Sequence, residues 1–244
     1  MQEITPGLWD VDEVGNAVHV YAWQWDGGLT LIDTGLPGNG ETILAALQRA
    51  GFSPQDVVRI IVTHGDVDHM GSLAELKAAT GAEVLCHTVE KEFLEHPERR
   101  KPANTPLGIL IRPVFFLARL LPRLRVKPVK PDRTFLDGTQ LPEGFVVVHT
   151  PGHTPGHISL FHPERRLLIS GDAVNNFTGK PGTPPSLFTP DMDAAYASIR
   201  KLVRKYGKEI DVIAFGHGRP ILAQGGAQLA ELAARLPGSN GATP

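Results

Sequence analysis

Apolar and polar residues alternate with two different periods in the first third of the chain, and this pattern predicts strands followed by a helix. Two strands are predicted at 17–25 and 29–33, because the turn-forming run Asp26-Gly27-Gly28 separates two stretches rich in apolar residues. A helix is predicted at about 41–50, where apolar residues recur on one helical face. The β-branched run at 59–63 predicts a buried strand, and the chain leaves it directly into a polar loop.

The remainder of the chain continues this mixture of elements. Strands mixed with helices in both halves predict an α/β domain in which helices cover the faces of the sheets. Helices are predicted at about 69–77, 191–206 and 222–235, and strands at 83–87, 145–149, 157–161, 166–170 and 211–215.

The segment at about 97–134 differs in composition from the rest of the chain. It contains an apolar stretch interrupted by Pro113, and it carries ten Lys or Arg residues against two acidic residues. Two interpretations stay open for this insertion. It forms amphipathic helices on the surface with solvated cations, or it forms a helical flap over the opening of a site, with Phe115, Phe116 and Leu120 facing a substrate.

Overall composition adds few constraints. The 244 residues are 41% hydrophobic and 20% charged, which is ordinary for a globular protein with a sizeable core. The single cysteine, Cys86, excludes an internal disulfide framework and fits a reducing compartment. The N-terminus lacks the pattern of a secretory signal, and no run of about 18 apolar residues is present. We therefore expect a cytoplasmic protein without a membrane span.

The expected organisation is a single domain at 1–237 that includes the insertion at about 97–134, followed by a flexible tail at 238–244. The net charge of −2 points to no particular class of partner. A small-molecule substrate is expected and nucleic acid is not, while the oligomeric state is left open.

A cluster of His and Asp residues follows the predicted strand at 59–63. His64, Asp66, Asp68 and His69 place four metal-binding side chains within six residues. A loop at a strand end can turn such side chains toward one point, and imidazole and carboxylate groups are suitable ligands for a divalent metal ion. The alternative is a helix cap with solvated neighbours, because Asp68 is well placed to cap the following helix.

Three further predicted strands also end in loops that carry His or Asp beside glycine, which allows a close approach of the backbone. Delivery of these side chains at four separate strand ends is poorly explained by coincidence and predicts one shared metal site. The three residues are His153 in the loop 150–157, Asp172 after Ser170-Gly171, and His217 between Gly216 and Gly218.

The order of these motifs, preceded by Asp33-Thr34-Gly35, resembles the metallo-β-lactamase superfamily over about residues 5–225, in its glyoxalase II-like and lactonase-like branch. The resemblance implies a four-layer αβ/βα sandwich with a dinuclear metal site at one edge of its two sheets. It also implies a supporting role for Asp33 near the site. By the same resemblance, one ion is bound by His64, Asp66 and His153, the other by Asp68, His69 and His217, and Asp172 bridges the two.

The sequence departs from the family pattern at one ligand position. The usual motif is His-x-His-x-Asp-His, and Asp66 stands where the second histidine is usual. Aspartate is a competent ligand, but its negative charge predicts a more neutral site with a less acidic bridging water. Zinc is the expected metal at both positions, and the additional oxygen ligand makes manganese or iron more competitive.

These features predict a metal-dependent hydrolase in which a metal-bound hydroxide attacks a small ester or thioester, with Asp68 and Asp172 as catalytic residues. A lactonase or a phosphodiesterase of the same fold is the alternative. Asn175 argues against the lactonase, because lactonases of this family often carry a tyrosine three residues after the bridging aspartate. Alternatives of another class are a mononuclear iron persulfide dioxygenase and a noncatalytic metal-binding protein. His157 lies beyond the ligand positions and is expected to begin a strand or to support a ligand.

Overall fold

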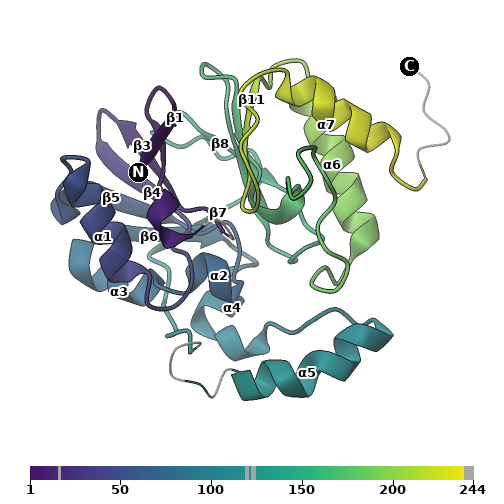
Figure 1. The fold of residues 1–244 in the computed structure, drawn as a ribbon, viewed down its shortest axis with the longest axis horizontal. Coiled ribbons are helices and arrows are strands. Elements are labelled where there is room, and N and C mark those ends of the chain that lie inside the picture. Colours follow the sequence, from purple (N-terminus) through teal and green to yellow (C-terminus); the bar gives the residue numbers. More distant parts are fainter. Residues whose placement is uncertain (16–17, 119–120, 122–124, 239–244) are drawn as a thin grey trace.

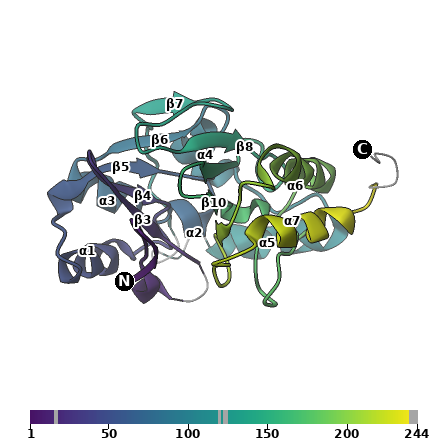
Figure 2. The ribbon, with the colours of Figure 1, turned by 90° about the horizontal axis from the view of Figure 1, so that it is seen from above.

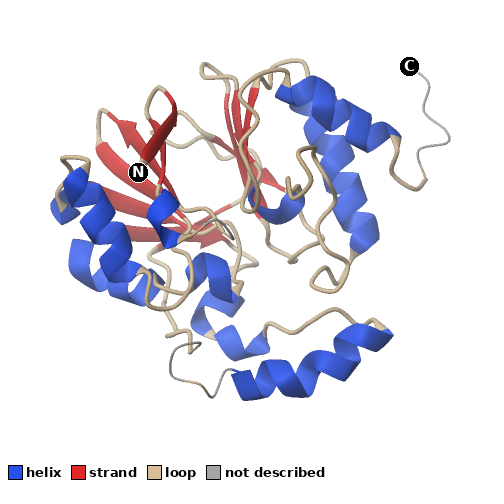
Figure 3. Cartoon of the chain, viewed as in Figure 1, coloured by secondary structure: helices blue, strands red, loops and turns tan. Residues whose placement is uncertain are grey.

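The computed structural model describes the whole chain except residues 16–17, 119–120, 122–124 and 239–244. Two β-sheets pack face to face, and helices cover the outer face of each sheet (Figures 1 and 3). The N-terminal half of the chain supplies one sheet with its helices, and the C-terminal half supplies the other (Figure 1). This arrangement is the four-layer αβ/βα sandwich predicted from the sequence.

The first sheet contains seven strands within the described residues, and these strands pair in chain order. Strands β1 to β4 pair antiparallel, whereas β4 to β7 pair parallel. The turn between β3 and β4 lies at the predicted hairpin, although β3 begins at Tyr21 and not at residue 17. The strands are β1 (Gln2–Thr5), β2 (Leu8–Asp10), β3 (Tyr21–Trp25), β4 (Gly28–Ile32), β5 (Val57–Ile61), β6 (Glu83–His87) and β7 (Arg133–Phe135).

Helices α1 (Gly40–Arg49) and α3 (Leu73–Thr80) cover the outer face of the first sheet (Figure 1). Side chains on β4 alternate between the two faces of the sheet, as the period of a strand requires. Leu31 packs in the apolar cluster that contains residues of α1 and α3, whereas Ile32 packs in the cluster shared with the second sheet.

The second sheet contains four strands within the described part of the chain, in the order β11-β10-β9-β8. Strands β10 and β11 pair parallel, and the other pairs are antiparallel. Seen from above, its helices lie on the opposite side of the molecule from α1 and α3 (Figure 2). The elements are β8 (Val146–His149), β9 (Ile158–His162), β10 (Leu167–Ile169), β11 (Val212–Ala214), α6 (Met192–Tyr206) and α7 (Gly225–Ala234).

The two sheets share an apolar core that also contains directed hydrogen bonds. The Tyr21 hydroxyl donates to the carbonyl oxygen of Phe215 at 2.8 Å, and the Trp23 indole N–H donates to the carbonyl oxygen of Glu143 at 3.1 Å. Both bonds are buried and join the N-terminal sheet to the C-terminal part of the chain. Because a buried donor without an acceptor costs free energy, these bonds help to fix how the two sheets face each other.

Several short elements carry no clear sequence signal. Strands β1, β2 and β7 and helix α4 (Lys91–Glu95) have three to five residues each, too few to show a period. Arg133 and Thr134, at the end of the predicted insertion, belong to β7 and pair with Leu85 and Cys86 of the first sheet. Other short elements are α2 (Val67–Met70) and the 3-10 helices η1 (Asp12–Val14), η2 (Pro54–Asp56), η3 (Pro97–Arg99) and η5 (Gly171–Ala173).

Helix α5 (Pro106–Ala118) is the main element of the predicted insertion, and it contains Pro113. It lies at the periphery of the molecule, beyond α4 (Figure 1). Its apolar residues Leu107, Leu110, Val114 and Leu117 are exposed by 55% to 72%. No helix within the described residues is both long enough and apolar enough to cross a membrane. Of the predicted tail, only Gly238 lies among the described residues.

Candidate metal centre

The ends of several strands from both sheets meet at one edge of the sandwich. Asp33 directly follows β4, and the loop after β5 carries His64 and Asp66. In open sheets with parallel strands, ligands bind beyond the carboxyl ends of the strands, so this edge is the expected place for a site. Asp66 precedes the first residue of α2, whose first turn carries Asp68 and His69.

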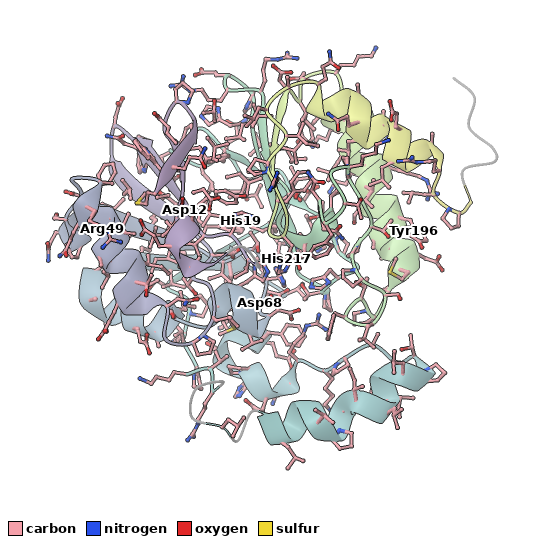
Figure 4. All side chains as sticks on the ribbon, viewed as in Figure 1. Asp12, His19, Arg49, Asp68, Tyr196 and His217 are labelled. Atoms are coloured by element: carbon pink, nitrogen blue, oxygen red, sulfur yellow. The ribbon has the colours of Figure 1, made fainter. Side chains whose placement is uncertain are left out.

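The second sheet delivers three more side chains to the same edge. His153 lies in the loop between β8 and β9, Asp172 lies in η5 after β10, and His217 follows β11. Figure 4 shows His217 and Asp68 near each other between the two halves of the molecule. Gly216 is required beside His217, because a Cβ atom there would overlap the Asp172 carboxylate.

All seven predicted ligands come together in groups with the composition of a metal site. We call His64, Asp66 and His153 the first half-site, and Asp68, His69 and His217 the second half-site; the ligand atoms within each group lie within 4.8 Å of one another. Asp172 forms a third such group with His64 and His69.

The separations between the ligand atoms fit a bound ion. Two ligands that are each about 2.0–2.2 Å from an ion lie about 3–4 Å apart. In the first half-site, His153 Nε2 is 3.1 Å and His64 Nε2 is 3.9 Å from Asp66 Oδ2. In the second half-site, His217 Nε2 is 3.4 Å from both Asp68 Oδ2 and His69 Nε2. Each group therefore has the dimensions of a coordination site.

Two buried polar atoms of the centre lack a hydrogen-bond partner among the described residues. They are His64 Nε2 and Asp172 Oδ1. A buried polar atom without a partner costs several kcal/mol on transfer from water, about 2–7 kcal/mol depending on the reference state. A divalent cation would satisfy both atoms, so the residues present fit a metal centre.

Hydrogen bonds on the far side of three of the four imidazoles aim their Nε2 atoms at the centre. His69 Nδ1 is 2.8 Å from Asp33 Oδ2, His64 Nδ1 is 2.9 Å from Thr63 Oγ1, and His153 Nδ1 is 3.2 Å from Thr189 Oγ1. Such outer partners fix the ring orientation of metal-binding histidines. The sequence-based expectation that Asp33 lies near the site agrees with its contact to His69.

The carboxylates give the centre a strongly negative field. Burial acts to lower the pKa of His69, but Asp172, Asp33 and Asp68 raise it to about 9. Burial likewise opposes the charged form of His217, and Asp172 and Asp68 raise its pKa to about 11. In the metal-free protein this field retains protons on His69 and His217, and the same field attracts a divalent cation.

Two functional side chains have no sequence motif that predicts them, Arg100 and Glu90. Arg100 donates through Nε to Asp66 Oδ1 and through Nη2 to Asp66 Oδ2 at 3.0 Å. Glu90 is fully buried and accepts hydrogen bonds from Gly65 N at 2.7 Å and Thr154 Oγ1 at 2.9 Å. Glu90 thus ties together the two loops of the first half-site, and burial raises its pKa to about 7.

His157 supports Asp172 and lies directly before β9, in agreement with both roles expected from the sequence. Its Nε2 accepts a hydrogen bond from the Asp172 backbone N–H at 2.8 Å, and its Nδ1 is 2.8 Å from Thr150 Oγ1. Burial, followed by the nearby His153, lowers the pKa of His157 to about 3. The ring is therefore neutral, and it accepts at Nε2.

A cavity of about 630 Å³ opens onto the metal centre. Both ends of the predicted insertion contribute to its wall, through residues around 97–102 and 125–128, whereas the described residues of α5 do not. The side chains of Phe115, Phe116 and Leu120 lie outside the described residues, so their predicted contact with substrate stays a prediction. The other lining residues include Leu36, Phe177, Pro185 and Phe188.

This sandwich, with His and Asp residues gathered at one edge of two sheets, defines a class of metal-binding hydrolase folds. The sequence profile of the metallo-beta-lactamase superfamily matches residues 14–217. The chain therefore belongs to the metallo-β-lactamase superfamily, as the order of its motifs predicts.

Curated relatives with similar sequences are named as hydrolases. Probable metallo-hydrolase YflN of Bacillus subtilis (strain 168) is 33% identical over 223 residues, which cover 84% of this chain and 81% of that protein. An N-acyl homoserine lactonase of Bacillus sp is 28% identical over 229 residues, covering 82% and 80%. Hydroxyacylglutathione hydrolase GloC of Haemophilus influenzae is 26% identical over 207 residues, covering 80% and 82%. The chain is thus a metal-dependent hydrolase.

Solved structures confirm the predicted fold. A metallo-beta-lactamase family protein from Thermus thermophilus superposes with a TM-score of 0.69 and 25% identity, covering 95% of this chain and 80% of that chain. The protein TTHA1623, solved in a di-iron-bound form, has a TM-score of 0.65 and 27% identity, covering 89% and 92%.

Proposed function

We propose that the two half-sites bind two divalent metal ions, that Asp172 bridges them, and that the chain hydrolyses a small carboxylic ester or thioester. The observation that carries the proposal is the spacing of the ligand atoms in both half-sites, described above. The position of Asp172 supports a bridge, because its Oδ2 is 3.6 Å from His153 Nε2 and 3.2 Å from His217 Nε2. One carboxylate therefore faces both half-sites.

Bound divalent ions would activate water as a nucleophile and polarise the carbonyl of the substrate. The contribution of the chain is to hold the ligands rigidly and to place Asp68 and Asp172 beside the reacting centre. Burial opposes the charge of Asp172, but His69 and His217 hold its pKa well below the usual range and keep it ionised. Zinc is the expected metal. The di-iron form of TTHA1623 supports iron as an alternative, and the carboxylate of Asp66 at a usual histidine position also suits manganese.

The cavity supports a small substrate with an apolar portion. A volume of about 630 Å³ lies within the usual range for small-molecule pockets, about 300–1,000 Å³. Phe177, Phe188 and Val126 provide apolar wall, while Lys101 and Arg125 are cations in the same lining. An apolar group of the substrate would contact the apolar wall, and a carboxylate or phosphate of the substrate would be attracted by Lys101 and Arg125.

A lactone is a cyclic ester, so the lactonase relatives fall within the proposed reaction class. Asn175 favours open-chain substrates over lactones. It occupies the position of the tyrosine expected in family lactonases, and its side-chain amide donates to the carbonyl oxygen of Thr183 at 2.5 Å. Asparagine has no hydroxyl group, and Asn175 is also buried and absent from the described cavity lining. It therefore cannot replace the tyrosine hydroxyl as a contact for a substrate.

The test is a substrate panel measured on protein reconstituted with zinc, manganese or iron. We expect aryl esters and thioesters to be hydrolysed faster than lactones, and we expect a chelator to abolish the activity. Asp172→Asn serves as the matched inactive control, since it keeps the size of the side chain. Failure to hydrolyse any ester, together with rapid metal-dependent cleavage of bis-p-nitrophenyl phosphate, would contradict the proposal in favour of a phosphodiesterase.

A further inference from the structure

Arg100 pairs with the aspartate that departs from the family motif. Two guanidinium nitrogens bind the two oxygens of Asp66, which is the bidentate geometry that arginine favours with carboxylates. The Nη2 atom of Arg100 also donates to the carbonyl oxygens of His153 at 3.1 Å and Phe188 at 2.7 Å. The pair therefore connects both loops of the first half-site to the cavity wall.

Arg100 lies in a buried place where its charge requires a partner. The residue is buried, with 8% of its surface exposed, and its side chain approaches the centre from the predicted insertion. Transfer of an arginine to such a place is costly unless its charge is balanced and its donors are satisfied. Asp66 balances the charge, and carbonyl oxygens accept further hydrogen bonds from the guanidinium, including Lys101 O at 3.0 Å from Nη1.

Asp66 can bind Arg100 and a metal ion at the same time. Each carboxylate oxygen has two lone pairs, so the bond from Arg100 to Oδ2 leaves one lone pair free. The same Oδ2 lies 3.1 Å from His153 Nε2, which is a suitable separation for two ligands of one ion. The bidentate pair also prevents rotation of the carboxylate, because rotation would break both bonds to the guanidinium.

We propose that Arg100 is a positioning residue for the first half-site, and that Asp66 and Arg100 act together as a substitute for a neutral histidine ligand. Asp66 supplies the ligand atom, while Arg100 holds it in place and cancels its additional charge. The inference rests on the proposed metal centre, but it requires no particular substrate.

This pairing corrects one expectation drawn from the sequence. Asp66 alone predicts a more neutral metal centre with a weaker ability to acidify water. The buried cation of Arg100 adds one positive charge next to Asp66, so the charge of the centre returns to that of the usual motif. The sequence alone could not reveal this, because Arg100 lies 34 residues after Asp66 in a segment with many other cations.

The deciding experiment measures zinc affinity of metal-free protein by competition with a chromophoric chelator, for Asp66→His, Arg100→Met and the double variant. Asp66→His leaves a buried guanidinium beside a neutral ligand, so affinity of the first half-site should fall about 10- to 100-fold. The double variant should bind zinc at this half-site at least tenfold more tightly than Asp66→His. If the double variant binds no better than Asp66→His, the two residues do not act as a unit and the proposal fails.

Arg112→Met is the matched control. Arg112 is a partly buried arginine of the same insertion, and its guanidinium binds Asn104 and Pro102 instead of a metal ligand. Combined with Asp66→His, this substitution should restore no affinity. Equal rescue by Arg112→Met and Arg100→Met would show a general effect of removed charge and would overturn the specific role of Arg100.

A second readout covers the case in which Asp66→His does not fold. Arg100→Met alone leaves the partly buried carboxylate of Asp66 without its cation, so the metal-free protein should melt about 10 °C below wild type. Two equivalents of zinc should recover more than half of this difference, since an ion replaces the missing charge. A fall of equal size with and without zinc would contradict the proposal. Absence of ester hydrolysis alongside the predicted affinities would count against the proposed function only.

Discussion

The two half-sites of the centre differ in how their negative charge is balanced. In the first half-site, the carboxylate of Asp66 is neutralised by Arg100, and the outer partner of His153 is the neutral hydroxyl of Thr189. In the second half-site, Asp68 has no arginine partner among the described contacts, and the outer partner of His69 is the carboxylate of Asp33. The second half-site is therefore the more negative of the two.

This difference in charge predicts that the two half-sites have unequal affinities for a divalent cation. A divalent cation gains more Coulomb energy where nearby carboxylates are not already paired with a cation. The two aspartates also differ in exposure, since the side chain of Asp68 is 30% exposed and that of Asp66 is 16% exposed. We infer that the second half-site binds its ion more tightly and faces the cavity mouth. The first half-site is connected to the cavity wall through the hydrogen bond from Arg100 to Phe188.

The largest expected effect follows from removal of a ligand of the second half-site. Asp68→Asn and His217→Ala should each lower kcat by at least about 100-fold, because both residues are proposed ligands of an ion that would stabilise the charge developing during the reaction. The measurement is steady-state hydrolysis by protein reconstituted with excess zinc, with circular dichroism to verify the fold. Wild-type kcat in either variant would remove the second half-site from catalysis.

A smaller effect is expected from the outer partners, and it compares the two half-sites directly. Asp33→Asn should weaken zinc binding in the second half-site by about 10- to 100-fold, since it removes a charged partner of a ligand histidine. Thr189→Ala is the matched change in the first half-site, and it should weaken binding only a few-fold because Thr189 is neutral. Equal losses in the two variants, measured by chelator competition, would argue against the difference in charge.

A pH-dependent effect is expected at His157, which contacts the backbone of Asp172, the proposed bridge between the half-sites. Its pKa is about 3 in the folded protein against 6.5 in the unfolded chain. A histidine with a lowered pKa contributes stability above pH 6.5, and this contribution is lost as the pH falls toward 3. Between pH 7 and 5, metal-free wild type should lose about 2 kcal/mol more unfolding free energy than His157→Gln, measured by urea denaturation. If the unfolding free energies of wild type and His157→Gln fall equally between pH 7 and 5, His157 does not contribute this pH-dependent stability.

The smallest effect concerns the cavity mouth beside the second half-site. Phe177 is 59% exposed, lines the cavity, and its ring centroid lies 5.7 Å from that of His217. Phe177→Ala should raise KM a few-fold for esters with a long apolar group and leave kcat nearly unchanged, the pattern of lost uniform binding. Lys101→Gln is the matched change for anionic substrates. If neither variant changes KM, substrates do not contact this wall.

Much of the centre could be predicted from the sequence because its residues follow strands. His64, Asp172 and His217 each lie three residues after the end of a short apolar strand, and the ends of neighbouring strands meet at one edge of a sheet. The long helix α6 was equally predictable, because its apolar residues recur on one face over fifteen residues. These signals are local, so they can be read without knowledge of the fold.

The remainder depends on contacts between distant segments. Arg100 is one of many cations in its segment, and only the fold places it against Asp66. Glu90 belongs to a short turn before α4, yet it joins Gly65 to Thr154 across two loops. Strand β7 has three residues, and its pairing with β6 gives it a strand conformation that its own sequence does not require.

Zinc titration of metal-free wild type in competition with a graded series of chelators tests the central claim most directly. The account predicts two zinc ions per chain, bound in two steps that differ in affinity by about tenfold or more. Asp33→Asn should weaken the tighter step, and Arg100→Met should change only the weaker step. Binding of a single ion, or two steps of equal affinity that respond alike to both substitutions, would contradict a dinuclear centre with unequal half-sites.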